Sequence, residues 1–215
     1  MKQVYIAEFF GTCILSLVVL TMVASSSVYT PFAVGFTLLL LVYLLGPISG
    51  CHINPAVTTG LWYMKKITSS EALSYIAAQF SGGVVAIFLA SLFVTDLAAR
   101  LKPLQERVVL DSIVGLAEAF GTLVLGVGVM SVVSGKVKAE MSGVAIGGSL
   151  LIGILIAGSA SNAVLNPAVA LALGSLNIFY IAGPMIGAAP GMRLYSFLIS
   201  ETPQRQKRVK NGSTK

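Results

Sequence analysis

Residues 49–60 read SGCHINPAVTTG and residues 161–169 read SNAVLNPAV, so the tripeptide Asn-Pro-Ala occurs twice, at Asn54-Pro55-Ala56 and at Asn166-Pro167-Ala168. Asparagine is a strong helix N-cap and proline is favoured at the first helical position, so each triplet predicts the start of a helix. Both triplets lie in stretches that are apolar enough for lipid. A helix that starts at membrane depth is tolerated only where its irregular segment lines a cavity. The pair therefore predicts a water-filled pore.

The composition indicates an integral membrane protein. Of the 215 residues, 56% are hydrophobic and 10% are charged, and the mean hydropathy is +0.90, whereas charged residues make up about a quarter of a typical soluble domain. Six segments are long enough to cross a hydrocarbon core of ~30 Å. The first is expected to be a retained helix, because no signal-peptide cleavage site follows its apolar part. We place the six spans near residues 4–25, 31–49, 73–97, 109–133, 141–159 and 176–199.

Lysine and arginine are divided unequally between the two sides of this topology. Only Arg100, Lys102 and Arg107 of the 14 fall on one side. The positive-inside rule then places both termini in the cytoplasm of a multi-pass protein of the cell inner membrane. Residues 203–215 are expected to be a solvated basic tail near anionic lipid. The other side carries Lys2, Lys65, Lys66, Lys136, Lys138, Arg193, Arg205, Lys207, Arg208, Lys210 and Lys215.

An internal repeat relates the two halves of the chain. IAEFFGTCIL at 6–15 resembles LAEAFGTLVL at 116–125, an offset of 110 residues, and the two triplets are offset by 112. A duplicated unit of three spans predicts inverted repeats, at about 1–98 and 109–200, within one channel domain of residues 1–202. Segments 50–66 and 160–174 are too short to span, so we expect two re-entrant half-helices that enter from opposite sides and meet near the midplane. The predicted fold is thus an all-α bundle of six transmembrane helices and two half-helices.

The predicted meeting point suits small uncharged solutes. Each helix N-terminus carries about half a positive elementary charge, so two of them aimed at one spot disfavour cations and protons. The amides of Asn54 and Asn166 can cap their helices and still donate an N–H to a passing oxygen, and backbone carbonyls before each cap can accept. Besides the two triplets, the residues predicted to line the pore are Gly50, Cys51, His52, Ile53, Asn162, Val164 and Leu165.

Two acids lie inside apolar segments. Glu8 and Glu118 would ordinarily suggest a proton relay, but their matched positions in the repeats favour a structural role as acceptors of hydrogen bonds from the re-entrant loops. His52, the single histidine, is expected to offer a hydrogen bond to the pore. The sequence contains no nucleophile–base pair, metal-ligand cluster or phosphate-binding loop. We therefore expect no enzyme activity, no cofactor, no metal site and no nucleic-acid partner.

Several motifs together resemble one family. These are SGCHINPAVTTG, SNAVLNPAV, the two AEF-GT segments, YIAAQFSGG at 75–83 and AGPMIGAAPG at 182–191. They resemble the aquaporins, or major intrinsic protein family, and the resemblance covers essentially the whole chain. It implies one pore per subunit, a homotetramer and passive flow in both directions. It also implies an outer filter made of an aromatic residue, a histidine or glycine, a small residue and an arginine.

By motif spacing, the four filter positions are Val34, Ile154, Ala163 and Val169, and none of them is polar. The chain resembles a bacterial member of the family. The absence of the arginine implies that its filter is a wider, apolar ring. This favours metalloid acids such as arsenite, glycerol, urea or ammonia, with water. Glycerol facilitators usually carry an aspartate where this chain has Ala170, which weakens specialised glycerol conduction. The alternatives are a water-selective aquaporin, a secondary active transporter, and a membrane scaffold that does not conduct.

Overall fold

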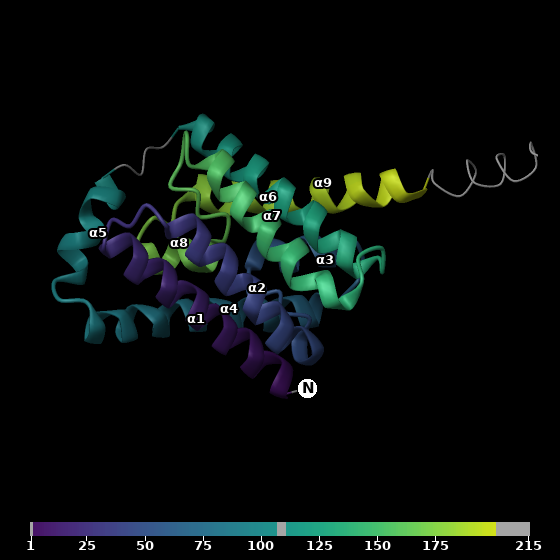
Figure 1. The fold of residues 1–215 in the computed structure, drawn as a ribbon, viewed down its shortest axis with the longest axis horizontal. Coiled ribbons are helices and arrows are strands. Elements are labelled where there is room, and N and C mark those ends of the chain that lie inside the picture. Colours follow the sequence, from purple (N-terminus) through teal and green to yellow (C-terminus); the bar gives the residue numbers. More distant parts are fainter. Residues whose placement is uncertain (1, 107–110, 201–215) are drawn as a thin grey trace, which may run out of the picture.

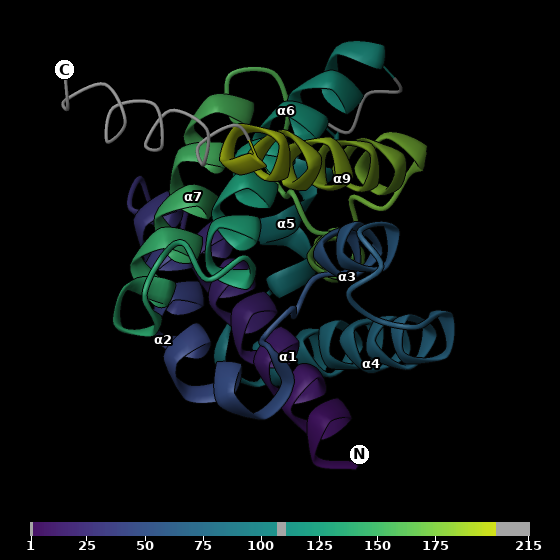
Figure 2. The same cartoon turned by 90° about the vertical axis from the view of Figure 1, so that its right-hand side faces the viewer.

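The computed structural model describes residues 2–106 and 111–200. Within them, the six long helices α1, α2, α4, α6, α7 and α9 form one bundle (Figures 1 and 2). Two half-helices, one further short helix and a 3₁₀ turn complete the described chain. The predicted tail of residues 203–215, together with Arg107, lies outside the described residues. The elements are α1 (Lys2–Ala24), α2 (Thr30–Ser49), α3 (Pro55–Tyr63), α4 (Ser69–Phe93), α5 (Leu97–Glu106), α6 (Ser112–Val133), η1 (Ala139–Met141), α7 (Ser142–Ala157), α8 (Pro167–Leu173) and α9 (Ile178–Ser200).

The long helices are those of an integral membrane protein. Five segments qualify as membrane spans by length and hydropathy: Lys2–Ala24, Thr30–Ser49, Ser69–Phe93, Ser112–Val133 and Ala139–Ala157. The sixth, α9, is 23 residues long and carries two prolines and Arg193, which lower its hydropathy. Large apolar side chains such as Phe36, Phe88 and Ile186 are exposed on the outside of the bundle, where lipid would surround them.

The two repeats pack as a pseudo-symmetric pair. Helix α1 packs against α4, α6 packs against α9, and α2 packs against α7 across the two repeats. The half-helix α3 lies against α9, and α8 lies against α4, so the last helix of each repeat supports the half-helix of the other. We call the end of the bundle where α1 begins and α9 ends the N-terminal face, and the opposite end, where α5 lies, the α5 face (Figure 1).

Glycines allow the closest helix pairs to approach. A Cβ atom at Gly187 or Gly191 of α9 would overlap backbone carbonyl oxygens of α6, and one at Gly82 of α4 would overlap a carbonyl of α1. Small residues at such contacts let helix backbones pack directly in a membrane. These contacts fix the α1–α4 and α6–α9 pairs, against which the half-helices α8 and α3 lie.

Helix α5 is an element that the span pattern did not predict. The span expected at 73–97 is a helix over Ser69–Phe93, and α5 follows it after a short turn. Leu97 and Leu101 of α5 are buried against the bundle. Gln105 Nε2 donates a hydrogen bond of 3.1 Å to the carbonyl of Leu173, the last residue of α8. Helix α5 therefore covers the outer end of the second half-helix.

Candidate functional site

Both Asn-Pro-Ala triplets begin a helix through the same cap. The Oδ1 atom of Asn54 accepts a hydrogen bond of 2.8 Å from the backbone N–H of Ala56. The Oδ1 atom of Asn166 accepts one of 3.0 Å from the N–H of Ala168. Each asparagine is extended and is followed by a proline at the first helical position. The caps satisfy backbone donors that a helix start would otherwise leave unpaired in the middle of the bundle.

The two caps are tied to each other across the repeats. Asn54 Nδ2 donates a hydrogen bond of 2.9 Å to the carbonyl of Leu165, and Asn166 Nδ2 donates one of 3.0 Å to the carbonyl of Ile53. The structure therefore brings the two asparagines, which are 112 residues apart in sequence, to one place inside the bundle. Each amide nitrogen carries two hydrogens. One N–H of each asparagine is left for a further acceptor.

The segments that lead into the caps share a strained backbone. Cys51 and Ile53 have φ angles of 50° and 38°, and their counterparts Ala163 and Leu165 have 49° and 54°. A residue other than glycine in this left-handed region costs about 1–3 kcal/mol. The same strain at equivalent positions of both repeats indicates that the surrounding contacts impose this conformation.

Glu8 of α1 holds the first loop in this conformation. Its carboxylate accepts hydrogen bonds from the backbone N–H groups of His52 at 2.9 Å and Ile53 at 2.6 Å. It also accepts from Ser49 Oγ at 2.6 Å and from Gln79 Nε2 at 2.8 Å. Glu8 is fully buried, and four donors surround it. Its oxygens are thus engaged in fixing the loop.

Glu118 of α6 does the same for the second loop. It accepts from the N–H groups of Val164 at 3.0 Å and Leu165 at 2.6 Å, and from Ser161 Oγ at 2.7 Å. The second repeat has no counterpart of the glutamine, because YIAAQ at 75–79 matches YIAGP at 180–184 and the fifth residue is Pro184. Both acids therefore accept hydrogen bonds from the backbone of their re-entrant loops.

His52 lies beside the first cap. Its Nδ1 is 3.2 Å from Thr58 Oγ1, and its ring centroid is 4.5 Å from that of Tyr75. The Tyr75 hydroxyl donates a hydrogen bond of 2.7 Å to the carbonyl of Ser49. These contacts fix the plane of the imidazole at the edge of the central cavity, which His52 borders.

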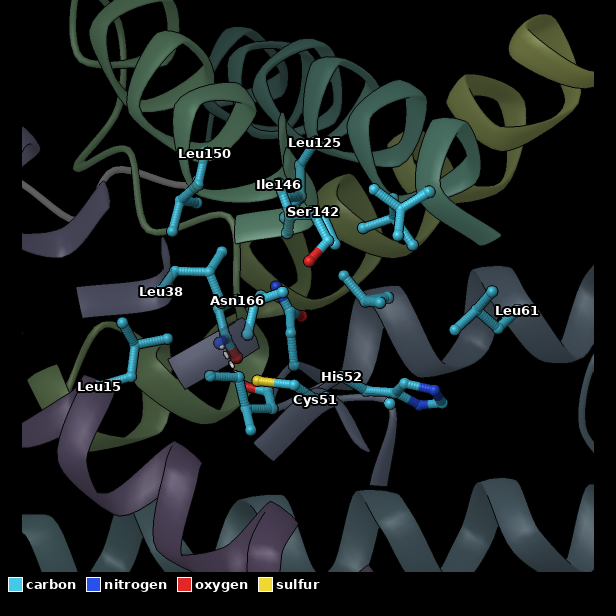
Figure 3. Close-up of a pocket in the computed structure, with 18 of the residues that line it drawn as sticks. Leu15, Leu38, Cys51, His52, Leu61, Leu125, Ser142, Ile146, Leu150 and Asn166 are labelled. Carbon is cyan, nitrogen blue, oxygen red and sulfur yellow. Dashed lines mark hydrogen bonds between the residues drawn. The ribbon is translucent and has the colours of Figure 1, made fainter. Parts of the chain in front are cut away.

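A cavity of about 430 Å³ runs beside the two caps. It extends from the N-terminal face, between the ends of α2 and α6 and the start of α7, past both asparagines. Figure 3 shows Leu38 and Leu150 on one side of Asn166, and His52 and Leu61 on the other. The wall is mainly aliphatic. Among the residues described, the wall contains no Asp, Glu, Lys or Arg. The polar side chains in the wall come from Tyr43, Cys51, His52, Asn54, Ser142 and Asn166.

The predicted filter residues divide into two groups. Val34 and Val169 border the cavity, whereas Ile154 and Ala163 do not. Leu150 borders it instead, one helical turn from Ile154 on the same face of α7. Ser142, Ile146 and Leu150 are cavity residues spaced four apart, and Ile154 continues this row toward the α5 face.

The predicted loop residues also divide. The first loop borders the cavity over its whole length, through Gly50, Cys51, His52 and Ile53, but the second does so only through Val164. Asn162 instead contacts the outer elements: its Nδ2 lies 3.3 Å from the carbonyl of Leu104 in α5, and its backbone N–H donates to Tyr180 Oη at 3.0 Å. Leu165 is fully buried.

Sequence reasoning missed Leu38 and Leu150, which border the cavity with Val34 and Val169. The signal was available, because Leu38 follows Val34 by four residues and Val42 follows Leu38 by four, a spacing that places all three on one face of α2.

No group of three or more His, Cys, Asp or Glu side chains that could hold a metal ion occurs in residues 2–106 and 111–200.

Comparison with known proteins agrees with this geometry. The model of the major intrinsic protein family matches residues 1–195. The chain belongs to this family. Major intrinsic proteins are channels and not enzymes, so the cavity beside the paired caps lies in a channel protein.

Individual members of the major intrinsic protein family are also similar to the chain. Aquaporin AqpM of Methanothermobacter thermautotrophicus is 33% identical over 186 residues, which cover 79% of this chain and 76% of that protein. Aquaporin NIP6-1 of Arabidopsis thaliana is 30% identical over 176 residues, which cover 76% and 55%. The X-ray structure of the aquaglyceroporin from Plasmodium falciparum has a TM-score of 0.74 at 21% identity and covers 94% of this chain and 96% of its own. That likeness supports the aquaporin fold.

Proposed function

We propose that this channel passes small uncharged solutes passively. The solutes are undissociated metalloid acids such as arsenite, together with glycerol, urea and ammonia, and water passes alongside them. The observation that carries this proposal is the apolar wall at the α5-face end of the cavity. Val34, Leu38, Leu150 and Val169 border it there. Position 169 is a valine where the resemblance implied an arginine, so this part of the wall is lined by hydrocarbon.

The centre of the cavity supports neutral rather than ionic passage. Its wall holds no charged side chain among the residues described, so an ion that enters would lose hydration without replacement. The two asparagine amides each offer one N–H to an oxygen of a passing solute. The N-terminal ends of two half-helices add positive potential that disfavours cations.

A strict preference for water is not favoured by the same wall. Water that crosses an apolar ring gives up hydrogen bonds that valine and leucine cannot replace. Glycerol and undissociated metalloid acids combine hydroxyl groups with a larger body, which contacts hydrocarbon over more of its surface. The ring therefore favours larger neutral solutes relative to its effect on water.

We propose further that the chain forms a homotetramer with one pore per subunit, in the inner membrane, with both termini in the cytoplasm. The distribution of basic residues supports this orientation. Arg100 and Lys102 lie on α5 at one face. Toward the N-terminal face, the start of α1, the loops after α3 and α6 and the last part of α9 carry Lys2, Lys65, Lys66, Lys136, Lys138 and Arg193.

The substitution Val169→Arg tests the filter. It would place a planar guanidinium with five donors in the ring, so glycerol and arsenite flux should fall by about tenfold, equivalent to about 1.4 kcal/mol in the barrier, while water flux is kept. The measurement is stopped-flow light scattering and arsenite uptake in reconstituted vesicles. Val169→Met adds length without charge and separates bulk from hydrogen bonding. Unchanged flux of the larger solutes in Val169→Arg would overturn the proposal.

A further inference from the structure

Outside the channel cavity, a hollow of about 390 Å³ lies where the end of α3 meets α9, lined by Tyr63, Met64, Lys65 and Arg193. A second hollow of about 450 Å³ shares Lys65 and continues along the loop to α4, lined also by Trp62, Lys66, Ile67, Thr68, Ser69 and Glu71. We call this region, from Trp62 to Glu71 with Arg193, the basic edge. It lies at the N-terminal face, where α3 ends and α4 begins (Figure 2).

The cations of the basic edge have no anionic partner in the chain as described. Lys65, Lys66 and Arg193 are exposed, and none of them forms an ion pair with a residue in 2–106 or 111–200. The one acid of the basic edge, Glu71, caps α4: its Oε2 accepts hydrogen bonds from the backbone N–H of Thr68 at 2.8 Å and from the Thr68 hydroxyl at 2.7 Å. Two like charges that face one hollow repel each other, and an anion between them removes that repulsion.

The backbone at Lys65 adds a second observation. Lys65 follows Met64, the C-cap of α3, and has a φ angle of 57°, in the left-handed region. The other half-helix, α8, is followed by Gly174 at a φ of 70°. A side chain in this conformation costs about 1–2 kcal/mol that glycine does not incur. The chain thus places a lysine over the hollow at a position whose backbone favours glycine.

The surroundings place this anion site at a membrane surface. Trp62 and Tyr63 are 46% and 61% exposed, and such aromatic residues gather at the level of lipid headgroups. On α9, Ile186 lies seven residues before Arg193 on the same face, toward the middle of the helix. The Ile186 side chain is exposed. A charged headgroup in the hollow would therefore have its acyl chain against the apolar surface of α9.

We propose that the basic edge binds the phosphate headgroup of an anionic phospholipid, such as phosphatidylglycerol, between Lys65 and Arg193. Basic pockets between membrane helices bind headgroups of this kind. Tyr63 also lines the hollow, and its hydroxyl is a further hydrogen-bond donor. The site is separate from the conduction path, so it stands or falls independently of the proposed solute selectivity.

Trp62 makes this proposal directly measurable, because it is the single tryptophan of the chain. The full-length protein is reconstituted in phosphatidylcholine vesicles that contain increasing fractions of either brominated phosphatidylglycerol or brominated phosphatidylcholine. Bromine quenches indole fluorescence only at short range, so quenching reports lipid at the basic edge. The wild-type protein should be quenched at lower fractions of phosphatidylglycerol than of phosphatidylcholine. Equal quenching by the two lipids would overturn the proposal.

Two double variants with the same loss of charge complete the test. Lys65→Gln with Arg193→Gln should lower the preference for phosphatidylglycerol by about fivefold for each charge removed. Lys136→Gln with Lys138→Gln removes two exposed charges from the loop before η1 and should leave the preference within twofold of wild type. A preference that survives the first pair, or falls equally in both, would overturn the proposal. Relief of quenching by added inorganic phosphate would also overturn it, because the site would then belong to a soluble anion.

Discussion

At the scale of single residues, two buried acids organise the site. Glu8 receives four hydrogen bonds and Glu118 receives three, and two in each set come from successive backbone N–H groups of a re-entrant loop. Loops of this kind carry left-handed residues that the backbone alone would not adopt. The hydrogen bonds to the two acids therefore offset the backbone strain of the loops. The caps of Asn54 and Asn166 depend on those loops.

The substitution Glu8→Gln should destabilise the protein. One oxygen would become an NH₂ group that faces donors, so at least one backbone N–H would lose its acceptor, at a cost of about 1.5–3 kcal/mol. We expect the thermal unfolding midpoint in detergent to fall by about 5–10 °C. The control is Glu71→Gln, an exposed capping position that glutamine can also fill, with a shift within about 2 °C. Equal shifts in the two variants would show that Glu8 does not hold the loop.

Cys51 provides a chemical probe of the cavity. It borders the cavity although only 4% of its surface is exposed, whereas Cys13 is buried on α1 away from the cavity wall. A mercurial reagent bound to the Cys51 sulfur would occupy the space beside Asn54, so we predict that such reagents inhibit solute flux. Cys51→Ala should abolish the inhibition and Cys13→Ala should retain it. Inhibition that persists in Cys51→Ala would place this thiol outside the conduction path.

At the scale of elements, glycine contacts set how closely the helix pairs approach. Gly187→Ala would drive a methyl group into the backbone of Ala119 on α6, so we expect a loss of about 1–3 kcal/mol from overpacking. Gly148→Ala is the matched control, because a Cβ there meets nothing within 4 Å and alanine gains up to about 1 kcal/mol in helix propensity. Thermal unfolding midpoints should thus move in opposite directions. A fall of similar size in both variants would contradict direct backbone packing of α6 on α9.

Elements with strong local signals could be predicted from sequence, and those that depend on tertiary burial could not. The half-helices α3 and α8 follow from asparagine caps and a proline at the first helical position. Helix α5 escaped prediction because Arg100, Lys102 and Pro103 give it the composition of a loop. It is held by burial of Leu97 and Leu101 against the bundle, which is a contact that no local pattern encodes.

At the scale of the whole molecule, the inverted repeat is what joins sequence to site. A duplicated unit with an odd number of spans forces its second copy into the opposite orientation, so the approach of the two triplets could be predicted from the repeat and its span count. The extent of the cavity could not be predicted from the sequence. Counting along α7 identifies the row that contains Leu150 and Ile154, but packing against α2 decides at which turn of that row the cavity ends. The role of each lining residue in selectivity stays a prediction.

The account rests on a continuous passage for uncharged solutes beside Asn54 and Asn166. The most direct test is the rate of glycerol entry into vesicles that contain the purified wild-type protein, measured against the imposed gradient and against temperature. A channel predicts a flux that rises linearly with the gradient, with an activation energy well below that of protein-free vesicles of the same lipid. A flux that saturates, or one that matches the protein-free vesicles in size and temperature dependence, would contradict the account.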